Sequence, residues 1–215
     1  MDEDVKRVGE EIVRVARDML RSGLVEGTSG NVSARVGDRV LITPSSVDYM
    51  EMTVGDLVLL DLEGEVVEGV RAPSSEKPMH LRVYRARGDV KAVIHTHSVY
   101  ASVLAVLRKP LPPLIDEFIF KFGGRIEVAD YGLTGSEELA ENAVRALGNR
   151  AAVLLANHGA LCCGKSPTHA LELAKSLERT AKVYVIASIL GEPHMLPEKT
   201  LKDGAAVYEL LRKAT

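Results

Sequence analysis

Apolar residues near the N-terminus recur at the spacing of one helical face. They are Val5, Val8, Ile12, Val15, Met19 and Leu20. At 3.6 residues per turn, these side chains would line one side of an amphipathic helix. Gly23 follows at a place where a left-handed residue commonly ends a helix. We therefore predict that the chain opens with a helix that ends near Gly23.

Two β-hairpins are predicted next, because two pairs of β-prone runs are each separated by a short turn that contains glycine. The first hairpin pairs residues 31–36 with 39–43. The second pairs residues 57–62 with 65–70.

The middle of the chain predicts a helix, a buried strand and another helix. The first helix follows residues 73–75 and has Pro78 in its first turn, where proline is well tolerated. Residues 90–95 form a short apolar run rich in β-branched residues, as expected of a core strand. Residues 98–107 then return to helical spacing.

The C-terminal part predicts a strand between two helices. Residues 134–137 have the form of a capping box that opens a helix to about Leu147. Residues 151–155 are a second candidate for a buried strand. The last long helix should have Ser166 as its cap and extend to about Gly191.

Mixed strands and helices with several hairpins favour an α/β fold with three layers, α/β/α, around a largely antiparallel sheet. The chain has 215 residues, of which 46% are hydrophobic, so it can bury a sizeable core. No repeat, low-complexity tract or long linker divides the sequence. We predict one domain that covers residues 1–215.

Charge and composition narrow the range of partners and compartments. A formal net charge of −3 gives no broad attraction to nucleic acid or anionic lipid, so we expect neither as a partner. The acidic N-terminus, residues 1–4, does not resemble an export signal. Apolar stretches such as 183–190 are far shorter than the roughly 20 residues that cross a bilayer. We expect a cytoplasmic protein in which the adjacent Cys162 and Cys163 serve packing.

Three histidines lie at or just beyond the ends of the predicted core strands. His95 and His97 are two positions apart, so on a strand both imidazoles would point to the same side and could bind one ion. An isolated pair of this kind is also compatible with surface or hydrogen-bonded histidines. His158 adds weight, because it follows another apolar strand. Three histidines at strand ends are typical of a catalytic zinc site with one open position.

The other histidines and two polar segments have weaker signals. We interpret His80, His169 and His194 as structural or solvated. Residues 74–76 could form a phosphate site at a helix N-terminus, although a simple helix cap explains the same residues. Residues 27–31 would let backbone amides approach an anion, but they match neither a P-loop nor a dinucleotide motif.

Together these segments resemble the class II sugar-phosphate aldolase and epimerase family, and most of all its fuculose-1-phosphate aldolase branch. The resemblance runs through Gly27-Thr28-Ser29-Gly30-Asn31-Val32-Ser33, Leu41-Ile42-Thr43-Pro44-Ser45-Ser46, Pro73-Ser74-Ser75-Glu76, His95-Thr96-His97, Gly123-Gly124 and Asn157-His158-Gly159. It covers nearly the whole chain, and the ordered set of segments is specific.

The resemblance implies a metal site, a phosphate site and an assembly. One zinc ion per subunit would be bound by His95, His97 and His158, with Glu76 as a fourth ligand that can leave the metal. Other divalent ions are possible, because imidazole binds several of them. The implied phosphate-binding residues are Thr28, Gly30, Asn31, Ser45, Ser46, Ser74 and Ser75. Members of the family form C4 homotetramers with active sites at subunit interfaces.

The implied reaction is reversible cleavage of a ketose 1-phosphate, such as L-fuculose 1-phosphate, to dihydroxyacetone phosphate and a short aldehyde, such as L-lactaldehyde. Glu76 would move a proton at the enediolate carbon. The fuculose-phosphate enzymes use a tyrosine as a second acid, but residues 115–118 contain none, and we hypothesise that Glu117 substitutes. Tyr131 and Tyr208 are weaker candidates.

Three other functions share this scaffold. They are sugar-phosphate 4-epimerisation, methylthioribulose-1-phosphate dehydration and a non-catalytic binding module similar to the head of adducin. A binding module has no reason to retain three histidines together with Glu76. Their joint presence favours an enzyme that acts on a small sugar phosphate.

Overall fold

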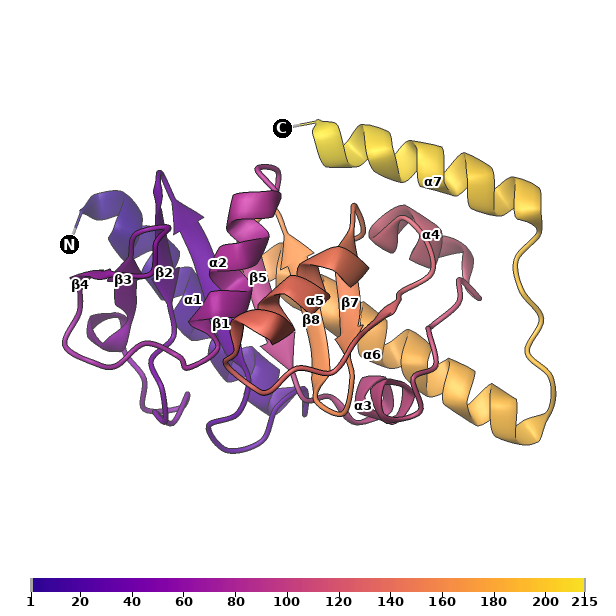
Figure 1. The fold of residues 1–215 in the computed structure, drawn as a ribbon, viewed down its shortest axis with the longest axis horizontal. Coiled ribbons are helices and arrows are strands. Elements are labelled where there is room, and N and C mark those ends of the chain that lie inside the picture. The colour runs from indigo at the N-terminus through magenta and orange to yellow at the C-terminus, as the bar shows by residue number, and fades with distance from the viewer. Residues whose placement is uncertain (1, 215) are drawn as a thin grey trace.

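A mixed sheet runs through the centre of the computed structural model, which describes residues 2–214 (Figure 1). Met1, part of the acidic N-terminus, and Thr215 lie outside this range. Within the range, the sheet has eight strands in the order β4-β3-β2-β1-β5-β8-β7-β6. The strands are β1 (Asn31–Val36), β2 (Arg39–Ile42), β3 (Val58–Leu60), β4 (Val66–Glu68), β5 (Ala92–Thr96), β6 (Val128–Ala129), β7 (Ala152–Leu155) and β8 (Gly159–Gly164). Neighbouring strands are antiparallel except β6 and β7, so the prediction of a largely antiparallel sheet is confirmed.

Helices cover both faces of this sheet, which confirms the three-layer α/β/α prediction. They are α1 (Glu3–Arg21), α2 (Lys77–Ala86), α3 (Val99–Val106), α4 (Asp116–Phe122), α5 (Glu137–Leu147), α6 (Pro167–Leu190) and α7 (Glu198–Lys213), with a short 3-10 helix at Val54–Asp56. α2 and α5 pack together on one face, whereas α1, α3 and α6 cover the other. None of the helices in residues 2–214 has both the length and the apolar character needed to cross a bilayer.

The central strands are apolar on both sides because each side faces its own core. On β5, Ile94 joins the core beneath α1 and α6, and its neighbour Val93 joins the core beneath α2 and α5. Cys162 and Cys163 on β8 divide between the two cores in the same way. Successive side chains of a strand point to opposite faces, so adjacent cysteines cannot share a core. Both are buried free thiols, which confirms their packing role.

The second half of the chain shows where the sequence pattern was incomplete. Residues 134–137 were predicted to cap the helix that ends near Leu147. The cap is Ser136, whose hydroxyl accepts a hydrogen bond from the Leu139 N–H at 3.1 Å, and Thr134 does not cap the helix. The helix from Ser166 is not the last, because α7 follows. Strands β6 and β8 and helix α4 were not predicted either. β8 has the sequence GALCCG, which lacks a strand signal but pairs with β5 and β7 on both edges.

Candidate metal centre

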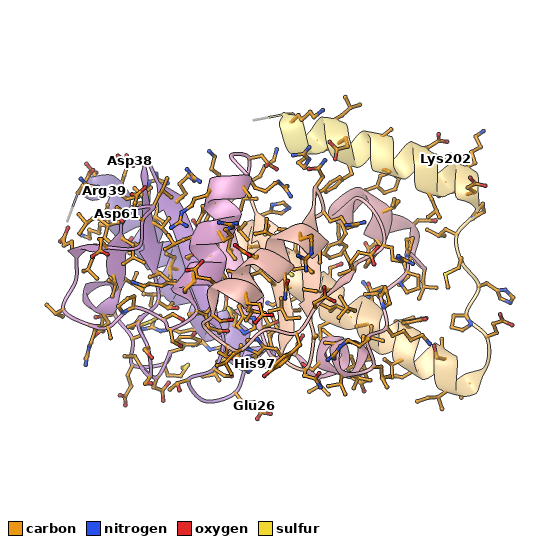
Figure 2. The ribbon with its side chains drawn as sticks, in the orientation of Figure 1. Glu26, Asp38, Arg39, Asp61, His97 and Lys202 are labelled. Atoms are coloured by element: carbon orange, nitrogen blue, oxygen red, sulfur yellow. The ribbon has the colours of Figure 1, made fainter. Side chains whose placement is uncertain are left out.

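Four separate segments meet at one end of the sheet. β5 ends there, and β1 begins beside it with Asn31 opposite His95. The turn between β7 and β8 carries His158, and Glu76 is the residue that precedes α2. Figure 2 shows His97 at the lower edge of the molecule in this view. Antiparallel pairing brings the start of one strand to the end of the next, which is why residues far apart in sequence converge here.

Glu76, His95, His97 and His158 bring one ligand atom each to a common point. These four atoms lie within 4.8 Å of one another. The Nε2 atoms of His95 and His97 are 2.9 Å apart. Glu76 Oε2 lies 3.2 Å from His95 Nε2, and Glu76 Oε1 lies 3.3 Å from His158 Nε2. Tetrahedral ligands with bonds of about 2.0–2.1 Å are themselves separated by about 3.3 Å, so the spacing suits a zinc-sized cation.

The backbone around the histidines has no room for larger residues. A Cβ atom on Gly159 would lie 2.1 Å from the carbonyl oxygen of Thr96, so only glycine lets the β7–β8 turn approach β5 this closely. Asn157, in the same turn, has φ of 55°, a left-handed conformation that asparagine tolerates. Gly30 has φ of 71°, and a Cβ there would lie 2.8 Å from the His95 carbonyl oxygen. These close approaches hold the histidines in place from two sides.

Burial favours the neutral form of His95 and His97, which is the form that a metal requires. Burial lowers the pKa of His95 well below its usual value, and the nearby His158 and His97 lower it further. Burial and His158 also lower the pKa of His97. His95 Nδ1 lies 3.0 Å from the Ala160 carbonyl oxygen, which can only accept. The His95 Nδ1–H must therefore donate, and this leaves the Nε2 lone pair directed at the cluster.

Glu76 also has the features of a metal ligand. Its side chain is buried, and Oε1 has no hydrogen-bond partner among residues 2–214. A buried carboxylate oxygen without a partner is costly, and a divalent cation at this point would satisfy it. Three imidazoles and one carboxylate are a set of ligands that suits a divalent cation, so the residues fit one.

The serines predicted to bind phosphate lie on two loops that the structure brings together. The Ser74 N–H donates to the Thr43 carbonyl at 3.1 Å, and the Ser45 N–H donates to the Ala72 carbonyl at 2.9 Å. The hydroxyls of Ser45 and Ser46 are 3.5 Å apart on an exposed surface. Ser75 is exposed as well, whereas Ser74 is buried. The paired loops therefore present several hydroxyls immediately before Glu76.

The glycine-rich loop, residues 27–31, contributes less directly to this arrangement. Thr28 is exposed, and Gly30 is tied down because the Tyr49 hydroxyl donates to its carbonyl oxygen at 2.6 Å. Asn31 is buried, and its side-chain amide donates to Glu76 Oε2 at 2.8 Å. Asn31 therefore contacts a predicted metal ligand as well as lying next to the predicted phosphate loop.

Two of the three candidates for the second proton donor, Glu117 and Tyr208, lie outside this cluster within one chain. Glu117 lies in the first turn of α4 with about half of its side chain exposed, 3.4 Å from Arg179 and 3.6 Å from Lys121. In Figure 1, α4 lies beside α7 in the upper right, well apart from the edge where Figure 2 labels His97. Tyr131 is exposed. Tyr208 is buried on α7, and its hydroxyl donates to the Asn149 carbonyl at 3.0 Å, as expected of a packing residue.

His80, which the sequence analysis interpreted as structural or solvated, lies close to the site. It is completely buried, and its ring contacts the side chains of Asn31 and Ser33. Burial, reinforced by His95, lowers its pKa to about 3, so the ring is neutral. One signal was available, because His80 is four positions after Glu76 and so shares a helix face with it. His80 and Asn31 are far apart in the sequence, so no local pattern predicts the contact between them.

Comparisons with known proteins agree with this geometry. Residues 10–185 match the profile of the family described as Class II Aldolase and Adducin N-terminal domain. The 5-deoxy-D-ribulose 1-phosphate aldolase of Bacillus thuringiensis is 40% identical over 203 residues, 93% of this chain and 94% of that protein. The L-fuculose phosphate aldolase of Escherichia coli strain K12 is 35% identical over 203 residues, 94% of this chain and 93% of that protein. A solved L-fuculose 1-phosphate aldolase superposes with a TM-score of 0.90 at 40% identity, covering 94% of this chain and 96% of that one.

Proposed function

Because this chain belongs to the class II aldolase and adducin N-terminal domain family and is a metal-dependent aldolase of ketose 1-phosphates, we propose that it uses zinc to cleave ketose 1-phosphates that end in a methyl group. The observation that carries this function is the convergence of Glu76 with three histidines. Relatives act on two such compounds, 5-deoxy-D-ribulose 1-phosphate and L-fuculose phosphate. Both would release dihydroxyacetone phosphate.

The two compounds differ only in the aldehyde half. Cleavage of 5-deoxyribulose 1-phosphate leaves acetaldehyde, and cleavage of L-fuculose 1-phosphate leaves the larger and more polar L-lactaldehyde. Residues 115–118 lack the tyrosine that the fuculose-phosphate enzymes use on this side. We therefore infer that 5-deoxyribulose 1-phosphate is the preferred substrate, and L-fuculose 1-phosphate is the second candidate.

The reaction breaks the bond between C3 and C4 of the ketose. The C4 hydroxyl loses its proton as the aldehyde forms, and the electron pair left on C3 spreads into the C2 carbonyl as an enediolate. A divalent cation at the four-ligand site supplies Lewis-acid stabilisation of this negative charge, worth several kcal/mol. A proton delivered to C3 then completes dihydroxyacetone phosphate.

Glu76 is the group in this chain that suits the proton transfer at C3. The side-chain amide of Asn31 donates a hydrogen bond to Glu76 Oε2 at 2.8 Å, and Glu76 Oε1 has no hydrogen-bond partner among the described residues. One oxygen is therefore anchored while the other is available to carry a proton. Proton transfer by a positioned carboxylate contributes about 10²–10⁴ in rate.

The paired serine loops suit the phosphate group of the substrate. Their exposed hydroxyls, from Ser45, Ser46 and Ser75, lie beside the start of α2. Backbone N–H groups at a helix start attract anions. Binding here would place C1 of the ketose next to Glu76, which directly precedes the helix.

Glu117 remains our candidate for the acid that serves the C4 oxygen, and it would act across a subunit boundary in a C4 homotetramer. It is exposed, and within one chain it contacts Arg179 and Lys121 and none of the four metal-site residues. Exposed apolar side chains on α3 and α6 suit burial between subunits. They are Val99, Val103, Val106, Ile186, Ile189 and Leu190.

Mixed tetramers test both the acid and the assembly. We expect Glu117→Gln and Glu76→Gln to be almost inactive alone, because each lacks one proton-transfer group. After dissociation and reassembly at equal amounts, about a quarter of the sites would combine an intact Glu76 with an intact Glu117 of the partner subunit. Activity recovering toward that fraction supports the arrangement. Full turnover of Glu117→Gln with normal zinc content, or a monomeric mass by light scattering, contradicts it.

A substrate panel tests the proposed function itself. The zinc-loaded protein is incubated separately with 5-deoxyribulose 1-phosphate, L-fuculose 1-phosphate, methylthioribulose 1-phosphate and ribulose 5-phosphate, and products are identified by mass spectrometry. We expect dihydroxyacetone phosphate from the first two, with the higher kcat/KM for the first. Conversion of ribulose 5-phosphate to an isomer, or loss of water from methylthioribulose 1-phosphate without cleavage, would instead assign an epimerase or a dehydratase.

A further inference from the structure

A chain of buried polar side chains leads from the core to Glu76. The amide nitrogen of Asn31 lies 2.8 Å from Glu76 Oε2. The amide oxygen of Asn31 lies 2.5 Å from His80 Nε2. His80 Nδ1 lies 2.7 Å from the Ser33 hydroxyl, which is 2.8 Å from the hydroxyl of Tyr84. All five side chains are buried.

The chemistry of the groups fixes the direction of every hydrogen bond in this chain. The Glu76 carboxylate can only accept, so Asn31 must present its NH2 group to it. The oxygen of that amide then faces His80 and can only accept, so His80 carries its proton on Nε2. His80 Nδ1 accepts from the Ser33 hydroxyl, and Ser33 accepts from Tyr84. Each donor has one acceptor, and His80 is the neutral Nε2–H tautomer.

We propose that His80 is a positioning residue that locks the side-chain amide of Asn31 in one orientation and, through it, the carboxylate of Glu76. The proposal rests on the proposed function, in which Glu76 transfers the proton. An asparagine amide has nearly the same shape after a half-turn, so shape alone does not select its orientation. The Nε2–H of His80 selects the observed orientation. In the turned orientation, the NH2 group of Asn31 would face the Nε2–H of His80, and the amide oxygen of Asn31 would face the carboxylate of Glu76, so neither contact could be a hydrogen bond.

The position of the network explains why a histidine suits this role. His80 is completely buried, so water cannot replace its N–H. Its ring bridges β1, where Asn31 and Ser33 point to the same face, and α2, which begins after Glu76. The ring therefore fixes the start of α2 against β1 at the point where the carboxylate must be held.

Two substitutions of His80 separate positioning from packing. His80→Gln can place an amide N–H near the position of Nε2–H, whereas His80→Leu fills the space without a donor. We expect His80→Leu to lower kcat per bound zinc about 10- to 100-fold, as for other residues that orient a metal-site group, with little change in KM. We expect His80→Gln to restore kcat to within about threefold of the wild type.

A double-mutant cycle tests whether His80 acts through Asn31. In an Asn31→Ala background the amide is gone, so His80→Leu should lower kcat by no more than about twofold further. An equal loss in both backgrounds would overturn the proposal. So would a His80→Leu protein that has a lower melting temperature but an unchanged kcat per bound zinc.

One measurement on the wild type needs no substrate. Nitrogen-15 NMR of the protein should show His80 as the neutral tautomer protonated on Nε2, and the Nδ1–H tautomer would overturn the proposal. A wild type that cleaves no ketose phosphate would contradict the proposed function, and the NMR result would still decide the role of His80.

Discussion

His158→Ala is expected to lose stoichiometric zinc and to lower turnover by about 10³-fold or more. His158 Nε2 lies 3.3 Å from Glu76 Oε1, and the residue comes from a different stretch of chain than His95 and His97. Without it, two imidazoles and one carboxylate would remain. The Lewis-acid contribution of a cation is several kcal/mol, and about 4 kcal/mol corresponds to a factor of about 10³. Zinc content by mass spectrometry and kcat on the panel substrates measure the effect.

The control for this substitution is His194→Ala, because His194 is exposed on the segment between α6 and α7. That variant should keep normal zinc content and normal turnover. A His158→Ala protein that binds one zinc ion per chain with full activity would show that the four residues do not form the catalytic site.

Glu76→Gln is expected to lower kcat by about 10²–10⁴ while the protein keeps its fold and most of its zinc. Glutamine has nearly the same shape, and its carbonyl oxygen can still accept the hydrogen bond that Asn31 donates to Oε2 at 2.8 Å. Its amide cannot carry the proton to and from C3. Exchange of the C3 hydrogen of dihydroxyacetone phosphate with deuterated water reports this step without the aldehyde. We expect the exchange to fall in parallel with kcat.

Glu26→Gln is a matched control for the loss of one negative charge. Glu26 is exposed, and Figure 2 labels it at the same lower edge of the view as His97. The control should change kcat and exchange by less than about twofold, because an exposed charge is strongly screened. If Glu76→Gln retained wild-type exchange, another group would have to move the C3 proton.

The sequence by itself determined most of the local structure and the chemical character of the site. Helical spacing predicted α1, and the alternation of β-prone runs and turns predicted the two hairpins. Two histidines at positions 95 and 97 had to share one side of a strand, whatever the rest of the fold. These signals are local, so each can be recognised from a few neighbouring residues.

The tertiary structure alone decided which segments complete the site. β8 has two glycines and two cysteines and becomes a strand because β5 and β7 pair with it on both sides. α7 was not predicted from the sequence. Its Gly204 packs so closely on α4 that a Cβ atom on this residue would lie 2.4 Å from Ile119. Asn31 and Glu76 are 45 positions apart, yet their side chains are hydrogen-bonded. Such contacts depend on strand order and on close packing between distant segments, which no local spacing of residues records.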